Sequence, residues 1–174
     1  MNNENNENFP QPPQNSRPSI EDEFKAKLGG EELKNALGFI AYMRAGGMTT
    51  SAEQPNRFWY HGRNVCILII HPIDGKTGWT ICDNPLTGQY DDFPASDKLK
   101  EFAWAHVNIC TSCGGSSGCG KQPGRSKFIF AKNFDNVCTS EVAFRNPDAE
   151  TLKTIMQMID IWKLHIDSEK NNGE

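Results

Sequence analysis

The sequence predicts a single α+β domain of two layers, in which helices cover one face of a mainly antiparallel sheet of about five strands. Two observations carry this prediction. Segments with an apolar period of 3.6 residues alternate along the chain with short apolar runs rich in β-branched or aromatic residues. The strand-like runs follow one another through short turn signals, which suit hairpins and therefore antiparallel pairing. With 174 residues, the chain is long enough for one ordinary hydrophobic core.

Four segments are expected to form helices. The first begins at Ser19, the second at Glu31, and the third at Ser96, from where it leads toward Cys110. The last is the clearest, because Asn146 is a good N-cap and a proline follows it at the first helical position. The apolar residues of this last helix keep the helical period: Leu152, Ile155, Met156, Ile159, Trp162 and Ile166.

Strands are expected in the apolar and aromatic runs that lie between turn signals. The run at 65–70 is continuously apolar and β-branched, which is typical of a strand buried on both faces. The polar segment 133–140 is expected to connect the last two strands. The five expected strands are 57–61, 65–70, 78–82, 128–131 and 142–144.

The two ends of the chain differ from its middle in composition. Residues 1–18 are mainly Asn, Glu, Gln and Pro, so we expect a disordered tail, and we expect another from 167 to 174. The single domain is then 19–166. The N-terminal residues contain no secretory signal, no segment is apolar enough for a membrane span, and the net charge is −4. A soluble, cytoplasmic protein without membrane partners is the expectation, and its six cysteines are then thiols or metal ligands.

The glycine–cysteine loop expected from Thr111 to Ser126, called the cysteine loop below, carries the strongest functional signal together with Cys110 just before it. Cys110 and Cys113 form a Cys-x2-Cys pair, Cys119 follows, and eighteen residues separate Cys119 from Cys138. Three clustered thiolates and a fourth ligand would complete a tetrahedral zinc site, although iron and copper(I) accept the same donors. The fourth ligand is either Cys138 or His106, which would share a helix face with Cys110.

Three other interpretations of these residues stay open. The cysteines could be ordinary reduced thiols, or Cys110 and Cys113 could be a redox pair that uses Cys119 or Cys138 as the resolving thiol. The basic segment 121–132 could bind nucleic acid weakly. The net negative charge of the chain disfavours such binding, because nucleic acid is itself an anion.

No catalytic grouping is evident elsewhere in the sequence. A phosphate-loop-like pattern from Gly115 to Lys121 fails at Gln122, where a Ser or Thr would be needed. The leading hypothesis is therefore a non-enzymatic module that binds a small molecule or a protein, with a metal ion that holds the cysteine loop to the sheet.

Overall fold

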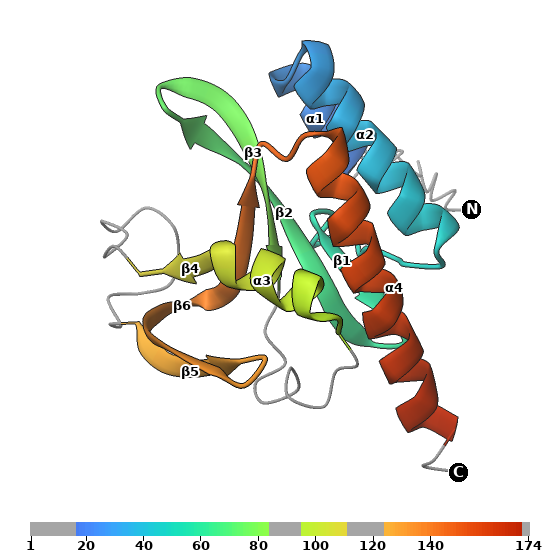
Figure 1. Ribbon diagram of the computed structural model, residues 1–174. Helices are drawn as coiled ribbons and strands as arrows, with labels where there is room; N and C mark the ends of the chain where they lie inside the picture. The colour runs from blue at the N-terminus through green and yellow to red at the C-terminus, as the bar shows by residue number, and fades with distance from the viewer. Residues whose placement is uncertain (1–16, 84–94, 111–123, 172–174) are drawn as a thin grey trace, which may run out of the picture.

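A computed structural model describes residues 17–83, 95–110 and 124–171 (Figure 1). In this part of the chain there are four helices: α1 Ile20–Lys27, α2 Gly30–Ala45, α3 Asp97–Ala105 and α4 Ala149–Asn171. There are six strands: β1 Arg57–Tyr60, β2 Arg63–Ile73, β3 Lys76–Asp83, β4 Val107–Ile109, β5 Arg125–Ile129 and β6 Lys132–Arg145. The α+β class is confirmed, with one strand more than the number expected.

All strand pairs of the sheet are antiparallel, in the order β1-β2-β3-β6-β4, and β5 also pairs with β6. The long strand β6 therefore has three partners. Its C-terminal part pairs with β3, where Ile81 lies opposite Phe144, and its N-terminal part pairs with β4 and β5. Figure 1 shows this N-terminal part curving away from β2 and β3 together with β4 and β5. We call this curved part, residues 107–110 and 124–142, the arm.

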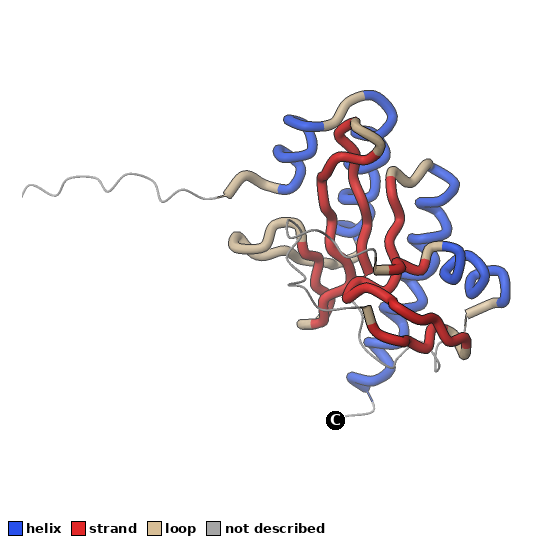
Figure 2. Tube along the Cα trace, turned by 90° about the vertical axis from the view of Figure 1, so that its left-hand side faces the viewer, coloured by secondary structure: helices blue, strands red, loops and turns tan. Residues whose placement is uncertain are grey.

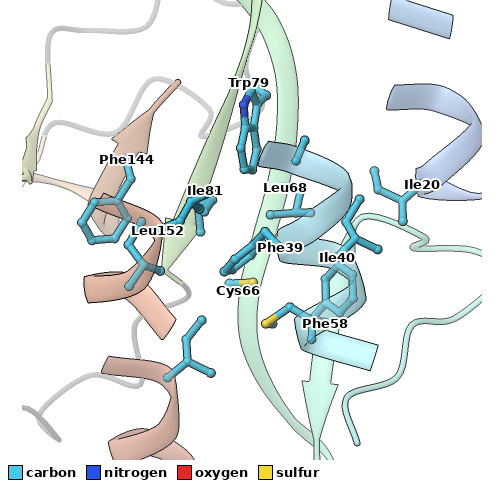
Figure 3. Packing of buried hydrophobic residues seen from close by; sticks show 14 of the residues in the cluster. Ile20, Phe39, Ile40, Phe58, Cys66, Leu68, Trp79, Ile81, Phe144 and Leu152 are labelled. Atoms are coloured by element: carbon cyan, nitrogen blue, oxygen red, sulfur yellow. The ribbon is translucent and has the colours of Figure 1, made fainter. Parts of the chain in front are cut away.

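The main core lies between the helices and one face of the sheet. Trp79 of β3 is fully buried and packs edge-on against Phe24 of α1, with ring centroids 5.7 Å apart. Figure 3 shows Phe39 and Ile40 of α2 directed toward the sheet at Leu68. Burial of each such side chain contributes roughly 1.5–3 kcal/mol, so the helix-covered face supplies most of the stability.

The opposite face of the sheet, toward the viewer in Figure 2, carries polar groups that are buried. Strand alternation places Thr80 and Glu141 there, because their strand neighbours pack in the helix-covered core. The Oγ1 atom of Thr80 lies 2.7 Å from Nε2 of His71, and Glu141 accepts a hydrogen bond from Lys127. Each of these two buried groups is therefore satisfied by a neighbouring side chain.

Two boundaries differ from the sequence prediction on either side of the arm. The third helix ends at Ala105, so the expected helical path to Cys110 is wrong, and β4 takes its place. The expected strand 128–131 is broken by a turn at Phe130 and Ala131, while the expected connection 133–140 is part of β6. Both errors have one cause. The conformation of these segments is determined by the pairing of β4 and β5 with β6, and not by their local composition.

The last helix also differs from its prediction, at both ends. It begins at Ala149, and Asp148 is its cap, since the Asp148 carboxylate accepts a hydrogen bond from the backbone N of Thr151 at 2.8 Å. This hydrogen bond lowers the pKa of Asp148. The expected cap Asn146 instead pairs with Trp79: its backbone N donates to the Trp79 carbonyl oxygen, and its Oδ1 accepts from the Trp79 N.

The C-terminal end of this helix extends to Asn171, so the expected disordered tail from residue 167 is wrong for most of its length. Two carboxylates tie these turns to the β1–β2 hairpin. Asp167 accepts a hydrogen bond from the Tyr60 hydroxyl, and Glu169 forms an ion pair with Arg63 at 2.6 Å. The expected N-terminal tail, 1–18, lies outside the described residues except for its last two.

Candidate metal site at the ends of the cysteine loop

The two ends of the cysteine loop meet at one position of β6. Cys110 directly follows β4, and Gly124 directly precedes β5. Ile109 of β4 and Arg125 of β5 are both paired with Val137. The chain therefore leaves the sheet after Ile109 and returns to it at Arg125. Both residues lie opposite Val137, on the two sides of β6, and we call this set of three paired residues a row.

Asn136, next to this row, contacts both ends of the loop. The backbone N of Cys110 donates to the Asn136 carbonyl oxygen, and Nδ2 of Asn136 donates to the Cys110 carbonyl oxygen, both at 2.7 Å. On the other side, Gly124 lies so close that a Cβ atom there would be 2.5 Å from the backbone carbonyl of Asn136. Only glycine fits at this approach.

Cys138 lies one residue beyond the same row, and like Cys110 it is half-buried. Both cysteines lie next to the Ile109–Val137 pair, on neighbouring strands. The register of this strand pair shifts between Val107 and Ile109, so the spacing of a regular ladder does not apply to the two cysteines.

The other two predicted ligands, Cys113 and Cys119, lie outside the described residues. Within residues 17–83, 95–110 and 124–171, no group of three or more His, Cys, Asp or Glu side chains has an arrangement suited to a metal ion. The described part of the chain thus places Cys110 and Cys138 on neighbouring strands and provides no complete site by itself. Zinc binding remains a prediction from the sequence.

His106 was expected to share a helix face with Cys110, and this reasoning is wrong. His106 is the C-cap of α3, and four residues of extended chain, about 13 Å at 3.3 Å per residue, separate it from Cys110. Its Nδ1 donates to the carbonyl oxygen of Phe102 at 2.8 Å, and its ring packs against the rings of Phe102 and Phe144, which also stack on each other. The position of His106 therefore favours Cys138 as the fourth ligand.

In the described part of the basic segment 121–132, two lysines have partners within the fold. Nζ of Lys127 lies 2.7 Å from the carboxylate of Glu141, which is only 2% exposed. Nζ of Lys132 lies over the rings of Trp104 and Phe134, 4.8 and 5.2 Å from their centroids. Both cations have a partner within the fold, which weakens the case for a nucleic-acid surface.

A second polar site escaped the sequence analysis. A cavity of about 490 Å³ lies between the β1–β2 turn and the last turns of α4, and its lining includes His61, Arg63 and Glu169. Beside it, burial and then the hydrogen bond to Asp167 raise the pKa of Tyr60. The residues from Asp167 to Asn171 belong to the segment expected as a tail, so no sequence signal pointed to this site.

No helix among the described residues combines the length and the apolar character that crossing a lipid bilayer requires. No family model, no curated protein and no solved structure matches this chain, so the evidence on its function comes from its own residues.

Proposed function

We propose that this protein is a non-enzymatic binding module for a small molecule or a protein, in which one zinc ion closes the cysteine loop onto β6. The ligands are the thiolates of Cys110, Cys113, Cys119 and Cys138. One observation carries the proposal: both ends of the loop meet β6 at Val137, directly before Cys138. A metal there would join β4, the loop and β6 at one point.

The chemistry of this ligand set supports a structural role for the metal. Four protein thiolates fill a tetrahedral zinc ion and leave no position for water or substrate. Binding to the folded chain also adds directly to the stability of the fold, because the unfolded chain offers no preformed site. The arm is the region that gains, since its own apolar cluster is small: Ile129 and Phe130, packed with Ala103 of α3.

The test is native mass spectrometry of the full chain, purified under reducing conditions without an immobilised metal column. We expect the native mass to exceed the denatured mass by one zinc ion, and Cys113→Ser to lose it. Cys138→Ala and His106→Ala then identify the fourth ligand, and we expect only Cys138→Ala to lose zinc. Cys66→Ala is the matched control, because Cys66 is buried in β2 and packs in the main core.

Two results would contradict the proposal. One is a native mass equal to that of the metal-free chain, together with a melting temperature that a chelator does not change. The other is a mass that falls by two hydrogens per cysteine pair after the reductant is removed, together with one rapidly alkylated thiol in the reduced chain. This result would point to thiol–disulfide chemistry instead.

A further inference from the structure

The cavity between the β1–β2 turn and the last turns of α4 has a positively charged lining, although the chain as a whole has a net charge of −4. Figure 1 shows this hairpin beside the C-terminal half of α4. Of the described residues that line the cavity, Arg63 and Lys170 carry a positive charge, His61 can gain one, and only Glu169 is negative. The volume of about 490 Å³ lies within the range of roughly 300–1,000 Å³ that is usual for small-molecule sites.

Both permanent cations of the lining keep donors that no described residue uses. Nη1 of Arg63 lies 2.6 Å from the carboxylate of Glu169, and this ion pair orients the guanidinium while it engages only one of its nitrogens. A guanidinium has five N–H donors in a planar fork that matches the geometry of an oxyanion. Lys170 is exposed and has no hydrogen bond or ion pair with any residue that the structure describes. An arginine fork and a free ammonium group therefore line the cavity from two different elements.

His61 stands in a turn whose backbone does not require a histidine. Both turn residues have positive φ, +46° for His61 and +76° for Gly62, and Asn-Gly is the usual sequence of such a two-residue hairpin turn. The His61 ring packs against the Tyr60 ring, with centroids 4.4 Å apart, and its Nε2 lies 3.4 Å from the carboxylate of Asp167. These contacts hold the imidazole at the cavity, where it provides a third donor for an anion.

We propose that this cavity binds a small molecule through an oxyanion group, either a phosphate or a carboxylate. This inference rests on the binding function proposed above and not on its metal. Arg63 supplies paired N–H donors, Lys170 an ammonium group and His61 a ring N–H. The carboxylates of Glu169 and Asp167 and the C-terminal end of α4 oppose an anion. The site therefore favours an oxyanion that reaches all three donors over a simple ion such as chloride.

The test is an NMR titration of the full ¹⁵N-labelled chain at constant pH and constant ionic strength. Inorganic phosphate is the probe in one arm and acetate in the other, and both replace sodium chloride. The backbone N–H resonance of Gly62 reports on the turn beside the cavity. We expect this resonance to shift saturably with at least one of the two oxyanions, and the arm with the higher affinity identifies the group that the site prefers.

Two lysine variants separate binding in the cavity from a general attraction of anions. Lys170→Gln removes the ammonium group from the lining. Lys153→Gln is the matched control, because Lys153 is an exposed residue of the same helix that does not line the cavity. Both variants lose one positive charge. We expect Lys170→Gln to weaken oxyanion binding about tenfold, the effect of one hydrogen bond to a charged group, and Lys153→Gln to leave it within about twofold of the wild-type value.

A third variant, His61→Asn, tests the imidazole separately from the turn. Asparagine is the preferred residue at this turn position, so the hairpin should keep its conformation. Oxyanion binding should nevertheless weaken about tenfold, because one donor is lost. The melting temperature of each variant is measured alongside, so that a loss of affinity is assigned to the site only in a folded chain.

Three results overturn this inference: no saturable shift of the Gly62 resonance with either oxyanion, equal affinities of Lys170→Gln and Lys153→Gln, or wild-type affinity in folded His61→Asn. Native mass spectrometry of the same sample keeps these results apart from the proposed metal. A chain that holds one zinc ion but binds no oxyanion contradicts this site and leaves the metal proposal intact. A metal-free chain that binds an oxyanion in the cavity supports this site and contradicts the metal.

Discussion

The helix-covered face of the sheet and the arm are built in different ways. The first is held by a large apolar cluster that includes Trp79, Phe39 and Ile155, packed between three helices and β1–β3. The arm has a small apolar cluster and depends on polar contacts: the Lys127–Glu141 ion pair and the Asn136–Cys110 hydrogen bonds. Its β5–β6 turn also carries backbone strain, because Phe130 and Ala131 have positive φ, whereas the residues with positive φ in the main body are of types that tolerate it: His61, Asp74 and Asn146.

This difference shows why a metal would belong on the arm and not on the main body. A large apolar core stabilises a fold without help, whereas a small core usually needs a cross-link or a metal. Changes in polar groups and backbone strain should therefore alter the free energy of unfolding most in the arm. In the main body, changes in packing and helix contacts should alter it most. Three substitutions test this contrast.

The largest effect is expected for Lys127→Met in the arm. This change leaves the carboxylate of Glu141, 2% exposed, buried without its cation. Loss of one partner of a buried ion pair costs about 3–5 kcal/mol, and the partial exposure of Lys127 reduces this to about 2–4 kcal/mol. The free energy of unfolding, from urea titration, is the measurement. Lys153→Met is the control, because the Lys153–Glu150 pair is exposed and should contribute nothing measurable. Equal stabilities of the two variants would contradict the assigned role of the pair.

A smaller effect is expected for Tyr42→Phe, which removes a polar contact between α2 and α4. The Tyr42 hydroxyl lies 2.6 Å from the carboxylate of Asp160 and 3.0 Å from the carbonyl oxygen of Met156. Loss of these contacts should cost about 1 kcal/mol at neutral pH, since apolar packing between the helices remains.

The same contact predicts a pH dependence on the alkaline side. Burial and then the hydrogen bond to Asp160 raise the pKa of Tyr42 above its usual value of 10.0. The folded chain keeps the phenol proton where the unfolded chain loses it, so this stabilisation is complete below pH 10 and declines as the pH rises further. The stability difference between the wild type and Tyr42→Phe should narrow above pH 10. A constant difference through that range would show that Asp160 does not hold the proton.

The smallest effect is a gain, expected for Ala131→Gly in the β5–β6 turn. Ala131 has a φ of +60°, which costs an alanine about 1 kcal/mol and a glycine almost nothing. The variant should therefore raise the free energy of unfolding by up to about 1 kcal/mol. Ala41→Gly, at an exposed position inside α2, should lower it by a similar amount. If both changes destabilise, the turn is not strained.

The sequence was sufficient to predict the elements whose side chains show a clear period. The helices after Ser19 and Glu31 and the strands through 65–70 and 78–82 were found because apolar spacing and burial agree there. The turn at Phe130 and Ala131 was missed because neither residue carries a turn signal. Burial of Phe130 in the cluster beneath α3 accompanies this turn, and that contact exists only in the folded chain.

The candidate site was predicted in part. Cysteine spacing alone brought Cys110 and Cys138 into one hypothesis, and the pairing of β4 with β6 places both next to the Ile109–Val137 pair. Asn136 could not have been found, because an asparagine in a polar segment has many uses and its role depends on which residue lies opposite. His106 was misassigned for the same reason, since a helix was assumed where the chain becomes β4.

The three-fold pairing of β6 has a consequence for the order in which the chain folds during synthesis. β3, β4 and β5 all precede β6 in the sequence, and each needs it as a partner. While the ribosome is still making residues 84–131, the first hairpin can already pack against α1 and α2, as N-terminal parts generally do. The arm has no such early partner. Its strands and three of its four predicted thiol ligands must wait, exposed and unpaired, until the last quarter of the chain, which begins with β6, emerges.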